Sequence, residues 1–165
     1  MNPGIGANSD ELSKVVLARF GLMPRKKDAK AGFHKLLLEL DDRKKKAANE
    51  KKPELAVITV EEMGNVSGIK RQTMYDYLRR WVSLQILKKT SLVNNGAVIT
   101  GYELNGFNLE NAFKKAEAII HDHMDKSFKI IKELENEIKK DKLRKNKDEN
   151  KEENKEEISS INPVN

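Results

Sequence analysis

A polar helix face lies near the middle of the chain, in the stretch SGIKRQTMYDYLRRW from Ser67 to Trp81. Helical spacing turns four apolar residues inward, namely Ile69, Met74, Leu78 and Trp81. The same spacing turns polar residues outward, namely Arg71, Gln72, Tyr75, Asp76 and Arg79. Arginine and glutamine can offer paired hydrogen-bonding groups to guanine and adenine edges in the major groove of DNA. Any solvated helix also has a polar face, so the surrounding elements must decide between the two interpretations.

The residues before this helix predict a second, shorter one. Thr59 as N-cap and Glu62 three positions later form a capping-box pattern, so a helix should begin there. Gly64 and the pair Ser67 and Gly68 interrupt the pattern, and the next helix runs to about Leu84. Two short helices joined by a glycine-containing turn are typical of a helix-turn-helix.

Two helices are predicted upstream. Ser9 can cap a short helix whose apolar face holds Leu12, Val16 and Phe20. A longer helical pattern spans residues 27–50, with an apolar stripe of Phe33, Leu36, Leu37 and Leu40. The run RKKK that starts at Arg43 is either a phosphate contact or a solvated helix end.

A β-hairpin follows the helix-turn-helix pattern. Asn95 and Gly96 suit the positive φ angles of a type I′ turn between two β-rich runs. Pairing about this turn sets Val93 opposite Val98 and Leu87 opposite Leu104, all on one face. Lys88 and Thr90 fall on the other face, so we expect a ribbon that is apolar beneath and polar above.

From Asn108 to about Lys145 the sequence predicts one long helix. Its apolar residues are spaced by threes and fours, namely Leu109, Phe113, Ala116, Ile120, Met124, Ile131, Leu134 and Ile138. A helix of this length extends ~50 Å, so a monomer would leave much of the stripe in water, and we expect a homodimer through residues 108–140. The polar repeat that follows cannot bury enough apolar area to order itself, so residues 146–165 are expected to form a disordered acidic tail.

These elements, in order, resemble the winged helix-turn-helix family of DNA-binding transcription regulators. The stretch EEMGNVSGIKRQTMYDYLRRW is similar to the paired helices of that family, with about three extra residues between Gly64 and Thr73. The matching positions are Glu62, Met63, Gly64, Val66, Ser67, Thr73, Met74, Tyr75, Tyr77 and Leu78. The long C-terminal helix resembles that of archaeal and bacterial winged-helix proteins that dimerise through a coiled coil.

The resemblance implies a surface for double-stranded DNA. The second helix would enter the major groove, where Thr73 and Tyr75 suit phosphate or thymine-methyl contacts, and the hairpin wing would reach the flanking backbone or minor groove. The residues expected to contact DNA are Lys70, Arg71, Gln72, Thr73, Tyr75, Arg79, Lys88, Lys89, Asn94 and Asn95.

The charge distribution agrees with a polyanionic partner. The net charge is +6, but the last twenty residues hold three Lys against six Asp and Glu, so the remaining chain carries +9. Such a basic body favours nucleic acid, and less often an acidic protein or a membrane surface.

Several classes of protein are not expected. The chain has no cysteine, which excludes disulfides, thiol catalysis and Cys-based metal sites. His121 and His123 lie about 200° apart around a helix and cannot share one metal ion. Without a catalytic constellation or a glycine-rich phosphate loop, we expect no enzyme activity, metal or cofactor. No apolar run approaches the ~18 residues of a membrane span and no signal peptide is visible, so we expect a cytoplasmic protein.

The sequence therefore predicts a mainly α protein with a small β-hairpin wing and a long C-terminal helix. We expect an N-terminal extension over residues 1–26, a winged helix-turn-helix domain over 27–106, a dimerisation helix over 107–145 and the acidic tail over 146–165. The expected function is sequence-specific DNA binding as a dimeric transcription regulator. The alternatives are a winged-helix adaptor that binds an acidic protein, and a non-specific chromatin-associated protein.

Overall fold

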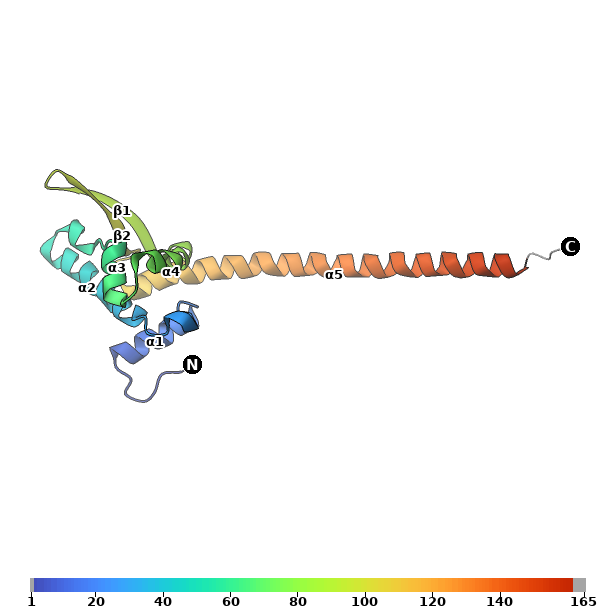
Figure 1. The fold of residues 1–165 in the computed structure, drawn as a ribbon, viewed down its shortest axis with the longest axis horizontal. Helices are drawn as coiled ribbons and strands as arrows, with labels where there is room; N and C mark the ends of the chain where they lie inside the picture. Colours follow the sequence, from blue (N-terminus) through green and yellow to red (C-terminus); the bar gives the residue numbers. More distant parts are fainter. Residues whose placement is uncertain (1, 162–165) are drawn as a thin grey trace. The chain divides into compact units, whose positions relative to one another are not determined.

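A computed structural model of the chain describes residues 2–161. The helices are α1 (Ser9–Arg19), α2 (Phe33–Glu50), α3 (Val60–Ser67), α4 (Arg71–Ser83) and α5 (Leu109–Ile161), and the strands are β1 (Leu87–Asn94) and β2 (Ala97–Leu104) (Figure 1). Two short 3₁₀ helices, Lys26–Asp28 and Pro53–Ala56, lie between the first three α-helices. This order confirms the predicted fold class, a winged helix-turn-helix with a long C-terminal helix.

The chain divides into two compact units, one up to Ile120 and one from His121 onward. The first unit contains the helix-turn-helix, the hairpin and the beginning of α5. The second consists of the rest of α5.

The helix-turn-helix begins with the predicted capping box. The Thr59 hydroxyl accepts a hydrogen bond from the Glu62 backbone N–H at 3.2 Å, and the Glu62 carboxylate accepts one from the Thr59 N–H. Helix α3 ends at Gly68, whose φ of 74° is left-handed. The turn backbone at Ile69 lies so close to Gly64 that a Cβ there would be 2.7 Å from the Ile69 oxygen. Glycine at position 64 therefore allows the tight turn that precedes α4.

The core of the first unit lies among α2, α3, α4, the base of the hairpin and the first turns of α5. Its largest fully buried side chains include Trp81, Phe33, Leu36, Leu40, Met63, Met74, Ile86, Leu87 and Leu104. The predicted stripe of α2 and the predicted inward residues of α4 from Met74 onward are all in this core. Ala112 and Ala116 of α5 are buried there too, so the beginning of α5 is part of the folded unit.

Helix α1 differs in detail from the prediction. Asn8 rather than Ser9 caps it, because the Asn8 side chain accepts from the Glu11 N–H at 3.0 Å. The buried residues are Ser13, Val15 and Leu17, whereas Leu12 is 45% exposed. The predicted face of Leu12, Val16 and Phe20 instead lines an apolar groove of about 380 Å³ together with residues of α2 and α5.

The hairpin has the predicted register. Leu87 pairs with Leu104 and Val93 pairs with Val98, and both Asn95 and Gly96 have positive φ angles, at 51° and 78°. The backbone of Ile58 adds a short bridge to β2 through two hydrogen bonds with Tyr102, each 2.8 Å long. The expected apolar face is buried only at the base, because Leu87 and Leu104 reach the core and Val93 and Val98 do not.

Helix α5 continues beyond the end predicted near Lys145, as far as Ile161. We expected residues 146–165 to lack order because they have nothing to bury. Lysine and glutamate are nevertheless good helix formers, so a segment made largely of them can extend a helix that has already begun. The last four residues of that predicted tail lie outside the described part of the chain.

Candidate nucleic-acid interface

The outward face of α4 borders two shallow grooves beside the hairpin. Gln72, Tyr75 and Arg79 line one groove of about 480 Å³ together with Tyr102 of β2. Arg71 and Tyr75 line the other, of about 340 Å³, together with Lys89, Thr100 and Tyr102. Tyr75 and Tyr102 therefore belong to both grooves, and the exposed side of α4 and one face of the hairpin form a continuous surface.

Arg71 is held against a neighbouring tyrosine on this surface. Its guanidinium lies 5.7 Å from the centre of the Tyr75 ring and donates a hydrogen bond to the Tyr75 hydroxyl at 3.3 Å. That hydrogen bond raises the pKa of Arg71 above its usual value, so the side chain stays charged. A cation fixed in this way beside exposed Gln72 has the hydrogen-bonding groups that a base edge requires.

The opposite side of α4 fixes the helix to the loop before α2. The Tyr77 hydroxyl donates to Asp28 at 2.5 Å and accepts hydrogen bonds from the backbone and side chain of Arg25. The Tyr77 ring packs edge-on against Phe33, with centroids 4.7 Å apart. The hydrogen bond with Tyr77 raises the pKa of Arg25. Thr73 also lies towards this side, about 200° around the helix from Tyr75, and is half-buried.

Lys88 and Lys89, which were both predicted to contact DNA, lie on opposite faces of the hairpin. Lys89 points to the face that borders α4, since it pairs with Tyr102 and lines the second groove. Lys88 points to the other face, where its ammonium lies 3.1 Å from the carboxylate of Glu103. Lys44 of α2 approaches the same carboxylate, also at 3.1 Å.

The ten predicted contact residues therefore fall into groups. Five lie on the surface shared by α4 and the hairpin, namely Arg71, Gln72, Tyr75, Arg79 and Lys89. Lys70 is the exposed N-cap of α4, and Asn94 and Asn95 lie at the hairpin turn. Thr73 and Lys88 lie away from the shared surface. Tyr102 and Thr100 belong to it but were missed, although the predicted register already set Tyr102 opposite Lys89.

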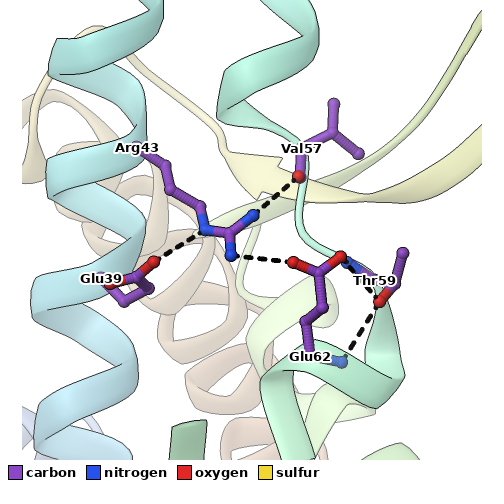
Figure 2. Close-up of polar contacts among 5 residues, drawn as sticks. All are labelled: Glu39, Arg43, Val57, Thr59 and Glu62. Atoms are coloured by element: carbon purple, nitrogen blue, oxygen red, sulfur yellow. Dashed lines mark hydrogen bonds and ion pairs between the residues drawn. The ribbon is translucent and has the colours of Figure 1, made fainter. Parts of the chain in front are cut away.

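Arg43 positions the first helix of the helix-turn-helix rather than a ligand (Figure 2). Its guanidinium donates to Glu39 at 2.9 Å, to Glu62 at 2.8 Å and to the carbonyl of Val57 at 3.2 Å. Glu62 is also the capping-box residue of α3, and Val57 precedes the residue that pairs with β2. Arg43 thus joins α2 to the beginning of α3 and to the bridge beside the hairpin. In the run RKKK, both Arg43 and Lys44 therefore have partners in other elements of the fold.

The charge state of Glu62 makes this network sensitive to acid. Burial alone would raise the pKa of Glu62, but hydrogen bonds from Arg43 and Thr59 and the charge of Arg43 outweigh it and lower the pKa below 4.5. A carboxyl group whose pKa falls on folding stabilises the fold above its unfolded pKa. The contribution is complete at neutral pH and is lost as the pH falls below 4.5 and through the folded pKa.

Two features are absent from the part of the chain that the structure describes. None of the helices within residues 2–161 is long and apolar enough to cross a membrane. Over the same residues, no three His, Cys, Asp or Glu side chains come together where they could bind a metal ion.

Known proteins offer one distant structural likeness to this chain. No protein-family model matches the chain, and no curated protein matches it either. Among solved structures, one described as a possible transcriptional regulator from Methanosarcina mazei Go1 is similar over 74% of this chain and 88% of its own, with 13% identity and a TM-score of 0.36. A likeness this distant does not indicate a function.

Proposed function

We propose that this protein binds double-stranded DNA with sequence preference and acts as a dimeric transcription regulator in the cytoplasm. The observation that carries the proposal is the surface on which α4 presents Arg71, Gln72, Tyr75 and Arg79 next to Lys89 of the hairpin. One helix with exposed arginine and glutamine side chains fits a major groove about 12 Å wide. The excess of +9 over residues 1–145 supports a polyanionic partner.

Arg71→Ala and Gln72→Ala test whether α4 reads bases. Each change should cost on the order of 1–3 kcal/mol on a duplex selected from a random pool, because a lost contact to a base edge removes discrimination. Binding to scrambled DNA should change little. The measurement is a set of binding isotherms on selected and scrambled duplexes, with thermal melts to show that the variants are folded.

A matched control is Asn49→Ala on α2, which is exposed and lines none of the grooves that Arg71 or Gln72 borders. It should bind both duplexes like the parent. Folded Arg71 and Gln72 variants with parental affinity for the selected duplex would contradict base reading by α4. The polar face would then be a solvated surface or a protein contact, as the adaptor alternative requires.

The two wing lysines should differ in their effect on DNA binding. Lys89→Ala should weaken binding to all duplexes alike and reduce the log–log salt dependence by about one unit, the value for one lost phosphate contact. Lys88→Ala should leave the salt dependence nearly unchanged, because its ammonium is paired with Glu103 on the other face. Titrations at several salt concentrations measure both slopes, and equal losses for the two variants would refute this assignment.

The proposal of a dimer rests on exposed apolar residues of α5 in the second unit, from His121 onward. Met124, Phe128, Ile131, Leu134 and Ile138 recur along this part of α5, and each is between 44% and 60% exposed. Met124, Ile131 and Ile138 repeat every seven residues, the spacing of a coiled-coil seam. A second copy of the same helix would cover this stripe from an equivalent surface.

Ile131→Lys should weaken the dimer by about 2–3 kcal/mol, or on the order of 100-fold in its dissociation constant, because it buries a charge from each chain. Asn136→Lys is the control, since Asn136 is exposed and lies about 140° around the helix from Ile131. Analytical ultracentrifugation over a range of concentrations compares the two. A parent chain that stays monomeric at high concentration would rule out the homodimer.

A further inference from the structure

An open apolar groove lies among α1, α2 and the first turns of α5, within the first compact unit. Its volume of about 380 Å³ falls within the range of small-molecule sites in proteins, roughly 300–1,000 Å³. Three helices supply its apolar walls, namely Leu12, Val16 and Phe20 of α1, Leu38 of α2, and Leu109 and Phe113 of α5. The groove therefore has the size and the lining of a site for a ligand with an apolar body.

The fold leaves the side chains of this groove partly in water. Leu12 is 45% exposed. Four more of the apolar side chains are half-buried, namely Val16, Phe20, Leu38 and Phe113. Removing such a surface from water is favourable, so a molecule that fits the groove gains free energy by covering it.

The walls of the groove are held in place by contacts beneath them. The rings of Phe20 and Phe113 pack edge to face, with centroids 4.8 Å apart. Leu37, which also lines the groove, is 2% exposed and belongs to the core. The hydroxyl of Ser13 donates a hydrogen bond to the carbonyl of Ser9 at 2.7 Å, so this polar group of the lining is already partnered. A ligand would meet a site that is already formed, which reduces the entropy cost of binding.

The groove carries an acidic group at the beginning of α5. Among the ten described residues that line it, only Glu110 is ionisable, and its side chain is 76% exposed. Lys114, one turn further along α5, lies 3.5 Å from the Glu110 carboxylate and is 68% exposed. An ion pair as exposed as this contributes little, so Lys114 can turn away and leave the carboxylate to a ligand.

The chemistry of the lining selects a cation over an anion. A positive charge would be attracted to the Glu110 carboxylate and to the aromatic rings of Phe20 and Phe113, whereas a negative charge would be repelled by the carboxylate. The size of the groove favours a small molecule over a protein. A stable protein interface involves about 20–30 residues on each side, and ten residues line the groove.

We infer that this groove binds a small organic cation with an apolar body, such as a quaternary phosphonium or ammonium compound. The apolar body lies against Phe20, Leu38 and Phe113, and the positive charge lies towards Glu110. The residues that line the groove come from α1, α2 and α5, whereas the proposed DNA surface is formed by α4 and the hairpin. The inference is therefore independent of the proposed function.

Tetraphenylphosphonium is a suitable probe, because tetraphenylborate has the same shape and the opposite charge. Isothermal titration calorimetry of the full-length chain, without DNA, should give a dissociation constant in the micromolar range for the cation and weaker binding of the anion. Leu12→Asn removes an exposed part of the apolar wall. It should weaken the binding of both ions about fivefold, because both lose the same apolar contact.

Glu110→Gln tests the charge of the ligand. It should weaken binding of the cation about fivefold without weakening binding of the anion, because the amide keeps the shape of the side chain and removes its charge. Glu50→Gln is the matched control, since Glu50 is exposed and lies about 18 Å along α2 from Leu38. It should bind both ions like the parent. Thermal melts show whether each variant is folded.

Three results would overturn the inference: no binding of the cation by the parent, or parental affinity for the cation in the folded Leu12→Asn variant or in the folded Glu110→Gln variant. Ile131→Lys identifies the other occupant. If the parent bound neither ion and the monomeric Ile131→Lys variant bound the cation, a second copy of the chain would cover the groove in place of a ligand. None of these results would affect the proposed binding of DNA by α4, which is measured separately.

Discussion

Trp81→Ala should lower the free energy of unfolding by about 3–5 kcal/mol, the usual cost of removing a large aromatic side chain from a core. Trp81 is 1% exposed and packs near Phe33, with ring centroids 6.4 Å apart. It lies on the buried side of α4, opposite the proposed DNA surface. The loss should therefore appear in chemical or thermal unfolding even without DNA.

The next residue of the same helix provides the control. Val82 is 37% exposed, so Val82→Ala should change the free energy of unfolding by no more than about 1 kcal/mol. If Trp81→Ala unfolded at the same denaturant concentration as Val82→Ala, the packing of α4 described above would be incorrect.

Gly101→Ala should destabilise the fold by about 2–4 kcal/mol through overpacking and the weakening of two backbone hydrogen bonds. A methyl group at position 101 would lie 2.8 Å from Cγ1 of Val57 and 2.9 Å from the carbonyl carbon of Ile58, and closer still to the Ile58 oxygen. The crowded atoms are largely backbone, so the hairpin would have to move away from Ile58. Urea unfolding measures the loss.

Gly4→Ala separates this steric effect from the general effect of replacing glycine. Nothing lies within 4 Å of a methyl group at position 4, so this variant should unfold like the parent. Gly101→Ala should also reduce DNA affinity, because β2 carries Tyr102 on the proposed surface. A variant with parental stability would show that the bridge between Ile58 and Tyr102 can be lost at no cost.

The elements that were predicted correctly are those specified by neighbouring residues. Thr59 and Glu62 begin α3 through contacts three positions apart, and Asn95 and Gly96 determine the hairpin register because they tolerate positive φ angles. The inward residues of α4 follow from helical spacing alone. Each of these features depends only on residues a few positions apart, so it can be predicted from the sequence without knowing the tertiary structure.

The roles of Arg43 and Lys44 could not be read in this way. Their partners Glu62 and Glu103 are 19 and 59 residues away in sequence, and both lysine and arginine look solvated in a run of four cations. The buried face of α1 was also wrong at Leu12, because the position of α2 and α5 decides which side of a short helix is covered. Helix α5 extends beyond its predicted end because lysine and glutamate favour the helix even where nothing is buried.

The candidate site was only partly accessible from the sequence. The exposed side of α4 followed from periodicity, and the structure adds that Tyr102 and Thr100 extend it onto the hairpin. Strand alternation places Lys88 and Lys89 on opposite faces of the hairpin, so only one of them can lie on the surface beside α4. Whether these residues bind DNA stays a prediction, because a surface does not by itself identify its partner.

Under the proposed function, the contacts of Arg43 and Lys44 with other elements have a consequence for how the preferred DNA sequence can change in evolution. Arg43 and Lys44 connect α2 to α3 and to the hairpin, and Tyr77 holds α4 through its hydrogen bond with Asp28. Gln72 and Arg79 take no part in these contacts. Substitutions at these exposed positions leave the core and its ion pairs in place. Duplicated copies of such a gene could thus acquire new binding sequences through changes at a few surface codons, with folding under separate selection.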